Sequence, residues 1–142
     1  MMPTIPGPPL KVYIAAPWVH KAEAREVAAW LRWCGVEITS RWLDFTGDAD
    51  NIDVRRSEAE QDMMDVRASD VLVVLNLALS EGKATEQGLA LAWGIPIIGM
   101  LGPANNVFHY LPNYTWVDSR AALLTELRAA QVRRNLRCVP VT

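Results

Sequence analysis

A glutamate near the start of a predicted helix is the residue best suited to chemistry. The segment from Ser80 to Gly88 leads out of a buried strand into that helix, whose first turn is expected to contain Glu86. The helix N-terminus lowers the pKa of a carboxylate there and keeps it ionised. Such a carboxylate at a strand-end cleft can attack an electrophilic carbon. The spacing fits a helix cap equally well, with Ser80 or Thr85 as the capping residue.

An aspartate and a tyrosine are the next candidates. Asp62 lies in the predicted helix before the most apolar strand, where a solvated helix face is the default interpretation. Tyr13 lies in the first predicted strand, so its side chain either packs in the core or points its hydroxyl into the cleft. Tyrosine is rarely fully buried without a partner for that hydroxyl. Both interpretations of Tyr13 remain open.

Histidines and tryptophans follow several of the predicted strands. His20 and His109 are far apart and show no metal-ligand spacing, so no metal site is expected. His20 is positioned to contact an anion, because it follows a strand end and precedes a helix. Trp18 and Trp42 also follow strand ends, where each can either stack on a flat base or serve only in packing.

Alternating strands and helices must position these residues. Apolar runs predict strands, and the unbroken run at 70–76 is typical of a strand covered on both faces. Glycine after residue 34 and after residue 93 marks helix ends. In the second helix, apolar contacts are expected from Met63, Met64 and Val66. The predicted strands are 10–16, 36–42, 70–76, 95–100 and 114–117, and the predicted helices are 21–34, 54–68, 83–93 and 120–132.

This order predicts a single-domain α/β sandwich of the flavodoxin or Rossmann type. Its five-stranded, mostly parallel sheet would carry helices on both faces. Open sheets of this kind bind ligands at the carboxyl ends of their strands. Function is therefore expected just after Ala16, Trp42, Asn76 and Met100.

Composition limits the class of protein. The 142 residues are 51% hydrophobic and 21% charged, which is a globular balance for one domain. Fourteen basic and sixteen acidic side chains give a net charge of -2, which argues against non-specific binding to nucleic acid. No apolar run approaches the length of a bilayer span, so no membrane partner is expected. Cys34 and Cys138 form no disulfide framework and fit a reducing cytoplasm.

The chain is divided into three parts by composition. Residues 1–9 contain four prolines and are interpreted as a flexible leader rather than a signal peptide. Residues 10–132 carry the strands and helices of the domain. Residues 133–142 are expected to form an irregular tail.

Together these segments resemble the nucleoside 2-deoxyribosyltransferase family, which includes the related 2'-deoxynucleoside 5'-phosphate N-hydrolases. The resemblance covers about residues 11–117. It rests on three pieces in order: Val12-Tyr13-Ile14-Ala15-Ala16-Pro17-Trp18, the Gln61-Asp62 pair eight residues before the strand that starts at Asp70, and Ser80-x-Gly82-x-x-x-Glu86-x-Gly88-x-Ala90 followed by Gly94-x-Pro96-Ile97-Ile98.

The resemblance implies a displacement at the anomeric carbon of a 2'-deoxyribose, with a nucleoside or nucleotide and a free base as partners. Glu86 matches the nucleophile, Tyr13 would orient it, and Asp62 would position or protonate the base. The chemistry uses the protein's own carboxylates, so no cofactor or metal is implied. The predicted substrate-binding residues are Ser80, Gly82, Ala16, Pro17, Trp18, His20, Trp42 and His109.

The resemblance leaves the acceptor of the sugar open. Many transferases carry an aspartate at the position of Ser80, whereas the monophosphate hydrolases carry a serine that contacts the 5'-phosphate. The loop 16–21 is closer to the apolar loop of the transferases. We expect transfer of the deoxyribosyl group to another base, with hydrolysis of 2'-deoxynucleoside 5'-monophosphates as the alternative.

The resemblance also implies a cytoplasmic homodimer or higher homo-oligomer. Family members borrow a residue from a neighbouring subunit, and the segment 106–109 with His109 lies about where that residue would fall. Two other functions remain possible on this fold. One is a catalytically silent nucleotide-binding protein. The other is an interaction domain in which Glu86 only caps a helix, so that Glu86→Ala costs about 1 kcal/mol and changes no activity.

Overall fold

The computed structural model describes residues 6–47, 50–103 and 106–137. Five strands and four α-helices alternate along the chain, with three short 3-10 helices between them. In chain order the elements are β1 Lys11–Ala15, η1 Trp18–His20, α1 Lys21–Trp33, β2 Glu37–Ile38, η2 Arg41–Asp44, α2 Ile52–Arg67, β3 Val71–Leu75, α3 Glu81–Ala92, β4 Ile97–Met100, η3 Val107–Tyr110, β5 Tyr114–Val117 and α4 Arg120–Arg137.

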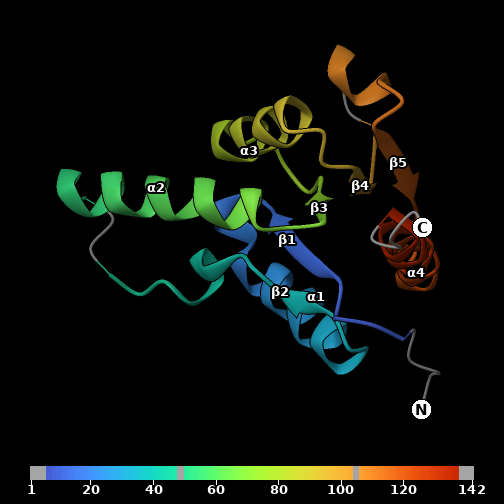
Figure 1. The fold of residues 1–142 in the computed structure, drawn as a ribbon. Coiled ribbons are helices and arrows are strands. Elements are labelled where there is room, and N and C mark those ends of the chain that lie inside the picture. The colour runs from blue at the N-terminus through green and yellow to red at the C-terminus, as the bar shows by residue number, and fades with distance from the viewer. Residues whose placement is uncertain (1–5, 48–49, 104–105, 138–142) are drawn as a thin grey trace.

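The five strands form one parallel sheet in the order β2-β1-β3-β4-β5. Helices α2 and α3 pack together on one face, and α1 and α4 lie on the other (Figure 1). This arrangement confirms the predicted α/β sandwich, with a sheet that is parallel throughout. The strand order reverses between β1 and β3, and ligands bind at the carboxyl ends of strands beside such a reversal.

The core explains why the strongest sequence patterns were reliable. All five residues of β3 are buried, as an unbroken apolar run predicts for a strand covered on both faces. In α1 the residues that share one helical face are the buried ones, namely Ala24, Val27, Ala28 and Leu31. The helix ends just before Gly35, whose φ of 90° is a left-handed conformation that favours glycine.

The second strand is shorter than predicted. β2 covers only Glu37–Ile38, and the chain then turns into η2 instead of continuing as a strand to residue 42. Two side chains replace the backbone partners that a longer β2 would have given to β1. Ser40 Oγ accepts from the Ile14 amide, and Trp42 Nε1 donates to the Ile14 carbonyl. Because these groups satisfy the backbone of β1, no further ladder is required.

Helix α2 buries a different face from the one predicted. Val66 is buried as expected, but Met63 and Met64 are 46% and 63% exposed. Residues one helical turn apart share a face, so Asp62 and Glu58 lie on the inward side with Val66. Met64 lies two positions before Val66 and points away from that stripe, while Met63 lies one position after Asp62, at the border of the stripe.

The last helix is longer than predicted, because the N-terminal segment is bound to it. α4 continues through residues 133–137, which were expected to be irregular. Arg134 donates to the carbonyls of Pro8 and Pro9 and forms an ion pair with Asp70 at 3.0 Å, while Asn135 donates to the carbonyl of Pro6. Residues 6–9 are therefore held against α4 rather than forming a free leader. Residues 1–5 and 138–142, with Cys138, lie outside the described residues.

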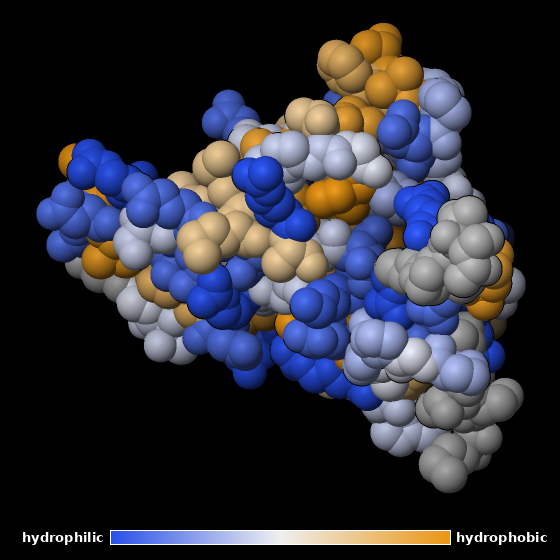
Figure 2. Space-filling view, viewed as in Figure 1, coloured by the Kyte–Doolittle hydropathy of each residue, from blue (hydrophilic) through white to orange (hydrophobic). Residues whose placement is uncertain are grey.

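Apolar side chains gather at the surface over η3, at the top of the view in Figure 2. Val107 is 80% exposed and Phe108 is 58% exposed. Exposed apolar patches mark interaction surfaces when they are large. Homo-oligomer formation stays a prediction. Within the described ranges, no helix has both the length and the apolar character that crossing a membrane requires.

We expect Arg134→Met to lower the free energy of unfolding by about 2 kcal/mol, because hydrogen bonds to charged groups each contribute roughly 1.5–3 kcal/mol. The measurement is urea unfolding. Arg133→Met is the matched control, because Arg133 is exposed on the same helix. Equal losses in the two variants would contradict a stabilising role for the contacts between α4 and residues 6–9.

Candidate active site

A contact between Tyr13 of β1 and Glu86 of α3 lies at the centre of the candidate site. Tyr13 is fully buried, and its hydroxyl donates a hydrogen bond to Glu86 Oε2. Both sequence interpretations of Tyr13 therefore hold at once, since the ring packs in the core and the hydroxyl reaches the strand-end cleft. This bond holds the Glu86 carboxylate in one orientation beside the carboxyl end of β1.

The electrostatic setting of Glu86 differs from the one predicted. Because α3 begins at Glu81, Glu86 lies in its second turn, beyond the strongest influence of the helix N-terminus. Burial raises the pKa of Glu86 from its ordinary 4.5 to about 8. The hydrogen bond from Tyr13 acts in the opposite direction, because it favours the ionised carboxylate. The predicted lowering of this pKa by the helix terminus is therefore wrong.

The capping role in α3 belongs to Ser80 and not to Glu86. Ser80 Oγ accepts from the backbone amide of Lys83 at 3.2 Å. A capping box would place a glutamate or glutamine at the position that Lys83 occupies. Glu86 instead bonds to Tyr13, so a helix cap does not account for it.

Asp62 is half-buried rather than solvated. Its Oδ1 is buried and accepts no hydrogen bond from any described residue. Burial, followed by repulsion from Glu58 and Asp65, raises the pKa of Asp62 to about 7, against the opposing effect of Arg41. The neighbouring Asp65 is held by Arg41 in a bidentate pair, which joins η2 to α2. Asp62 is thus a carboxyl that can hold a proton near neutral pH.

A small inner cavity of about 130 Å³ brings most of the predicted site residues together. It lies at the carboxyl end of β1 and the N-terminus of α3, where the strand order predicted a ligand site. The carboxyl groups of Asp62 and Glu86 belong to its walls. The lining residues are Ala16, Trp18, Trp42, Asp62, Ser80, Gly82, Lys83 and Glu86.

A larger outer cavity of about 500 Å³ shares Trp18, Trp42 and Asp62 with the inner one. One wall is aromatic, with Trp18 and Phe45 ring centroids 6.1 Å apart and Trp18 and Trp42 centroids 6.1 Å apart. The other wall is a face of α2. The lining residues are Trp18, Trp42, Phe45, Val54, Arg55, Glu58, Ala59 and Asp62.

The aromatic wall is fixed by contacts outside the cavity. The indole of Trp42 is anchored by its 2.8 Å bond to the Ile14 carbonyl. Lys21 Nζ lies 4.6 Å from the Trp18 ring centroid and also donates to the Phe45 carbonyl. Aromatic walls held in this way provide a flat, preformed surface for a planar ligand.

Three predicted substrate-binding residues line neither cavity. Pro17 precedes η1, and His20 Nδ1 lies 3.5 Å from Glu23 Oε1. His109 is 4% exposed, and its Nε2 lies 3.1 Å from Gln87 Oε1. The role of His109 at a neighbouring subunit stays a prediction.

Sequence reasoning missed Lys83 and Glu58. Lys83 is 4% exposed, and its Nζ donates to Asn76 Oδ1 and to the Ala78 carbonyl, each at 2.7 Å. Burial lowers its pKa. Spacing could have found both residues, since Lys83 precedes Glu86 by three positions and Glu58 precedes Asp62 by four on a helix.

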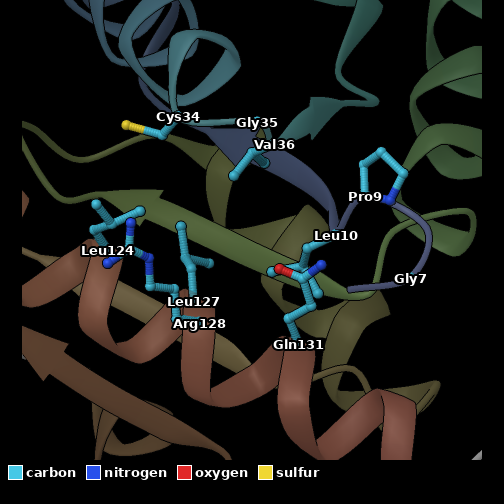
Figure 3. A pocket seen from close by; sticks show the side chains of 10 residues that line it. All are labelled: Gly7, Pro9, Leu10, Cys34, Gly35, Val36, Leu124, Leu127, Arg128 and Gln131. Carbon is cyan, nitrogen blue, oxygen red and sulfur yellow. The ribbon is translucent and has the colours of Figure 1, made fainter. Parts of the chain in front are cut away.

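A separate cavity of about 140 Å³ lies at the other end of the sheet, between the end of α1 and α4 (Figure 3). Leu124, Leu127 and Arg128 contribute to it. None of the residues predicted to act on substrate lines it. Within the described ranges, no three His, Cys, Asp or Glu side chains gather in a way that could hold a metal ion.

Comparison with known proteins establishes the fold. No protein-family model and no curated protein matches the sequence. A conserved protein from Enterococcus faecalis V583 has a similar structure, with 20% identity, a TM-score of 0.63 and coverage of 85% of this chain and 98% of that one. The CMP N-glycosidase BcmB of Clostridium botulinum is also similar, with 19% identity, a TM-score of 0.57 and coverage of 84% and 98%. The latter shares the fold of the nucleoside 2-deoxyribosyltransferase family, which confirms the fold implied by the resemblance.

The raised pKa of Glu86 predicts a dependence of stability on pH. The folded protein holds this proton more tightly than the unfolded chain, so this stabilisation is complete below about pH 4.5 and is lost as pH rises through about 8. The raised pKa of Asp62 also makes the folded protein less stable as pH rises. We expect the free energy of unfolding to fall by a few kcal/mol between pH 5 and pH 9, at ~1.4 kcal/mol per pKa unit.

The test is urea unfolding at both pH values for the native chain, Glu86→Gln and Glu81→Gln. Glu86→Gln should reduce the pH dependence to the part that Asp62 contributes, whereas Glu81→Gln on the exposed start of the same helix should leave it unchanged. A dependence as large in Glu86→Gln as in the native chain would show that the Glu86 carboxyl is not protonated in the folded state.

Proposed function

We propose that this protein cleaves the N-glycosidic bond of a nucleoside 5'-monophosphate, with Glu86 as the nucleophile. The observation that carries the proposal is the Tyr13–Glu86 contact beside the half-buried, unpaired Asp62 carboxyl in one cavity. Such a pair of carboxyl groups suits a reaction in which one must attack while the other donates a proton. The similar fold of a CMP N-glycosidase supports the same bond type.

In the first step the Glu86 carboxylate attacks C1' of the sugar, and the bond from C1' to the base nitrogen breaks. Asp62 gives its proton to the departing base, and the sugar remains attached to Glu86 as an ester. The Tyr13 hydroxyl holds Glu86 in line for this attack. In the second step the Asp62 carboxylate takes a proton from water, which attacks C1' and releases Glu86.

The start of α3 supports a phosphate on the substrate. Ser80 and Gly82 line the inner cavity at the N-terminus of the 12-residue helix α3. Ser80 accepts from the amides of Lys83 and Ala84, which leaves the first two backbone amides of the helix for an anion. Lys83 uses two of its three ammonium hydrogens on Asn76 and Ala78, so one remains for a ligand. These donors suit a 5'-phosphate next to a sugar over Glu86, and they favour the monophosphate over the free nucleoside.

Transfer of the glycosyl group to a second base is the other candidate. The outer cavity is open and large enough for one base to leave and another to enter, between rings that are already fixed. A free base would then replace water in the second step. The loop 16–21, which is apolar as in the transferases, favours this acceptor, whereas Ser80 favours hydrolysis.

We expect Glu86→Gln to lower the rate of base release by about a thousandfold or more, because the substitution removes the nucleophile. The assay is chromatography of purified protein with ribo- and 2'-deoxynucleosides and their 5'-monophosphates, each with and without free adenine. Glu81→Gln is the control. Base release without adenine establishes hydrolysis, and a new nucleoside or nucleotide formed only with adenine establishes transfer. Absence of turnover by the native chain, or full activity in Glu86→Gln, would contradict the proposal.

The two raised pKa values predict a bell-shaped pH profile. Activity needs Glu86 ionised and Asp62 protonated, so kcat/KM should peak between about pH 7 and pH 8. Asp62→Asn should lower kcat by roughly a hundredfold. It should also abolish the fall at high pH, because only the ionisation of Glu86 is then left. A profile that keeps its alkaline fall in Asp62→Asn would assign the acid to another group.

A further inference from the structure

The outer cavity carries a second carboxylate that the proposed reaction does not use. Glu58 lines the wall formed by α2, one helical turn from Asp62, so the two side chains share a face of the helix. No hydrogen bond or ion pair joins the Glu58 carboxylate to another described side chain. Its charge is close enough to Asp62 to raise the pKa of that group. Glu58 is therefore an unoccupied hydrogen-bond acceptor facing the space between the aromatic rings and α2.

The order of the carboxyl groups follows the order of atoms in a bound nucleotide. Glu86 lines only the inner cavity, Asp62 lines both, and Glu58 lines only the outer one. A sugar over Glu86 would place the base between Trp18 and α2. Asp62 would then meet a base atom near the glycosidic bond, and Glu58 an atom further from it.

We propose that Glu58 selects bases with an exocyclic amine at this outer position, namely cytosine and adenine. This inference rests on the proposed function. Along the edge of cytosine that would face α2, the acceptors O2 and N3 lie nearest the glycosidic bond, and the 4-amino group lies further from it. In adenine N7 is followed by the 6-amino group. Either base can accept from the Asp62 carboxyl and donate from its amine to Glu58.

Uracil, hypoxanthine and guanine present a carbonyl oxygen where those amines stand. That oxygen would face the Glu58 carboxylate, and two acceptors without a shared proton repel each other. Arg55 is the one cationic residue among those that line this cavity, and it would favour a carbonyl. Its side chain is 65% exposed and pairs with Asp50 at 3.5 Å. The described walls thus favour the amine.

The test compares substrates that differ only at this atom. The kcat/KM values for CMP and UMP, and for AMP and IMP, are measured in the ribose or deoxyribose series that the protein cleaves. We expect the amino member of each pair to be preferred by about tenfold or more, as for loss of a hydrogen bond to a charged group. Glu58→Gln should bring both ratios close to one, because an amide can rotate to donate to a carbonyl. Glu60→Gln, an exposed residue of the same helix, should leave them unchanged.

Binding of the free bases separates this inference from the proposed function. Calorimetric titration of the native chain with cytosine and uracil, and with adenine and hypoxanthine, requires no catalysis. Tighter binding of cytosine and adenine that disappears in Glu58→Gln supports the inference even if no bond is cleaved. Equal binding within each pair, no binding at millimolar base, or a preference that survives in Glu58→Gln would overturn it. Cleavage without base preference would overturn it while leaving the proposed function intact.

Discussion

The bond between the Tyr13 hydroxyl and the Glu86 carboxylate is the interaction on which the candidate site depends. It joins the inner strand β1 to helix α3 and holds a buried carboxyl at the carboxyl-terminal end of the sheet. Burial alone would keep Glu86 protonated at neutral pH, and a protonated carboxyl is a poor nucleophile. The hydrogen bond that Tyr13 donates to the ionised carboxylate opposes that tendency and holds the carboxylate in one orientation. The protonation state of Glu86 therefore depends on the balance between burial, which raises its pKa, and the hydrogen bond from Tyr13, which favours the ionised form.

The surrounding structure keeps three regions distinct within a short distance. In the proposed reaction the start of α3 supplies hydrogen-bond donors, the space over Glu86 takes the sugar, and the rings of Trp18, Trp42 and Phe45 take the planar base. The edge of β1 makes this arrangement possible, because Ser40 and Trp42 satisfy its backbone and turn the chain into the cavity wall. Shortening of β2 is thus a condition for the aromatic wall.

The fold followed from sequence wherever a pattern reports burial directly. The unbroken run of β3 and the periodicity of α1 are local properties, and so is the position of Glu86 after β3. Other features depend on contacts between distant residues. The end of α4 depends on Arg134 and the prolines that precede β1, and the raised pKa of Asp62 depends on the packing of α2. Periodicity also misassigned Met63 and Met64, because one helix can bury carboxyl groups in place of methionines when those groups line a cavity.

In the proposed reaction Glu86 bonds covalently to the sugar during cleavage. The most direct measurement is mass spectrometry of peptides from protein quenched in acid during turnover of a 5'-monophosphate. We expect a glycosyl group on the peptide that contains Glu86, and we expect this adduct to be absent from Glu86→Gln. Product formation with inverted configuration at C1' and no adduct, or an adduct on a different residue, would contradict it.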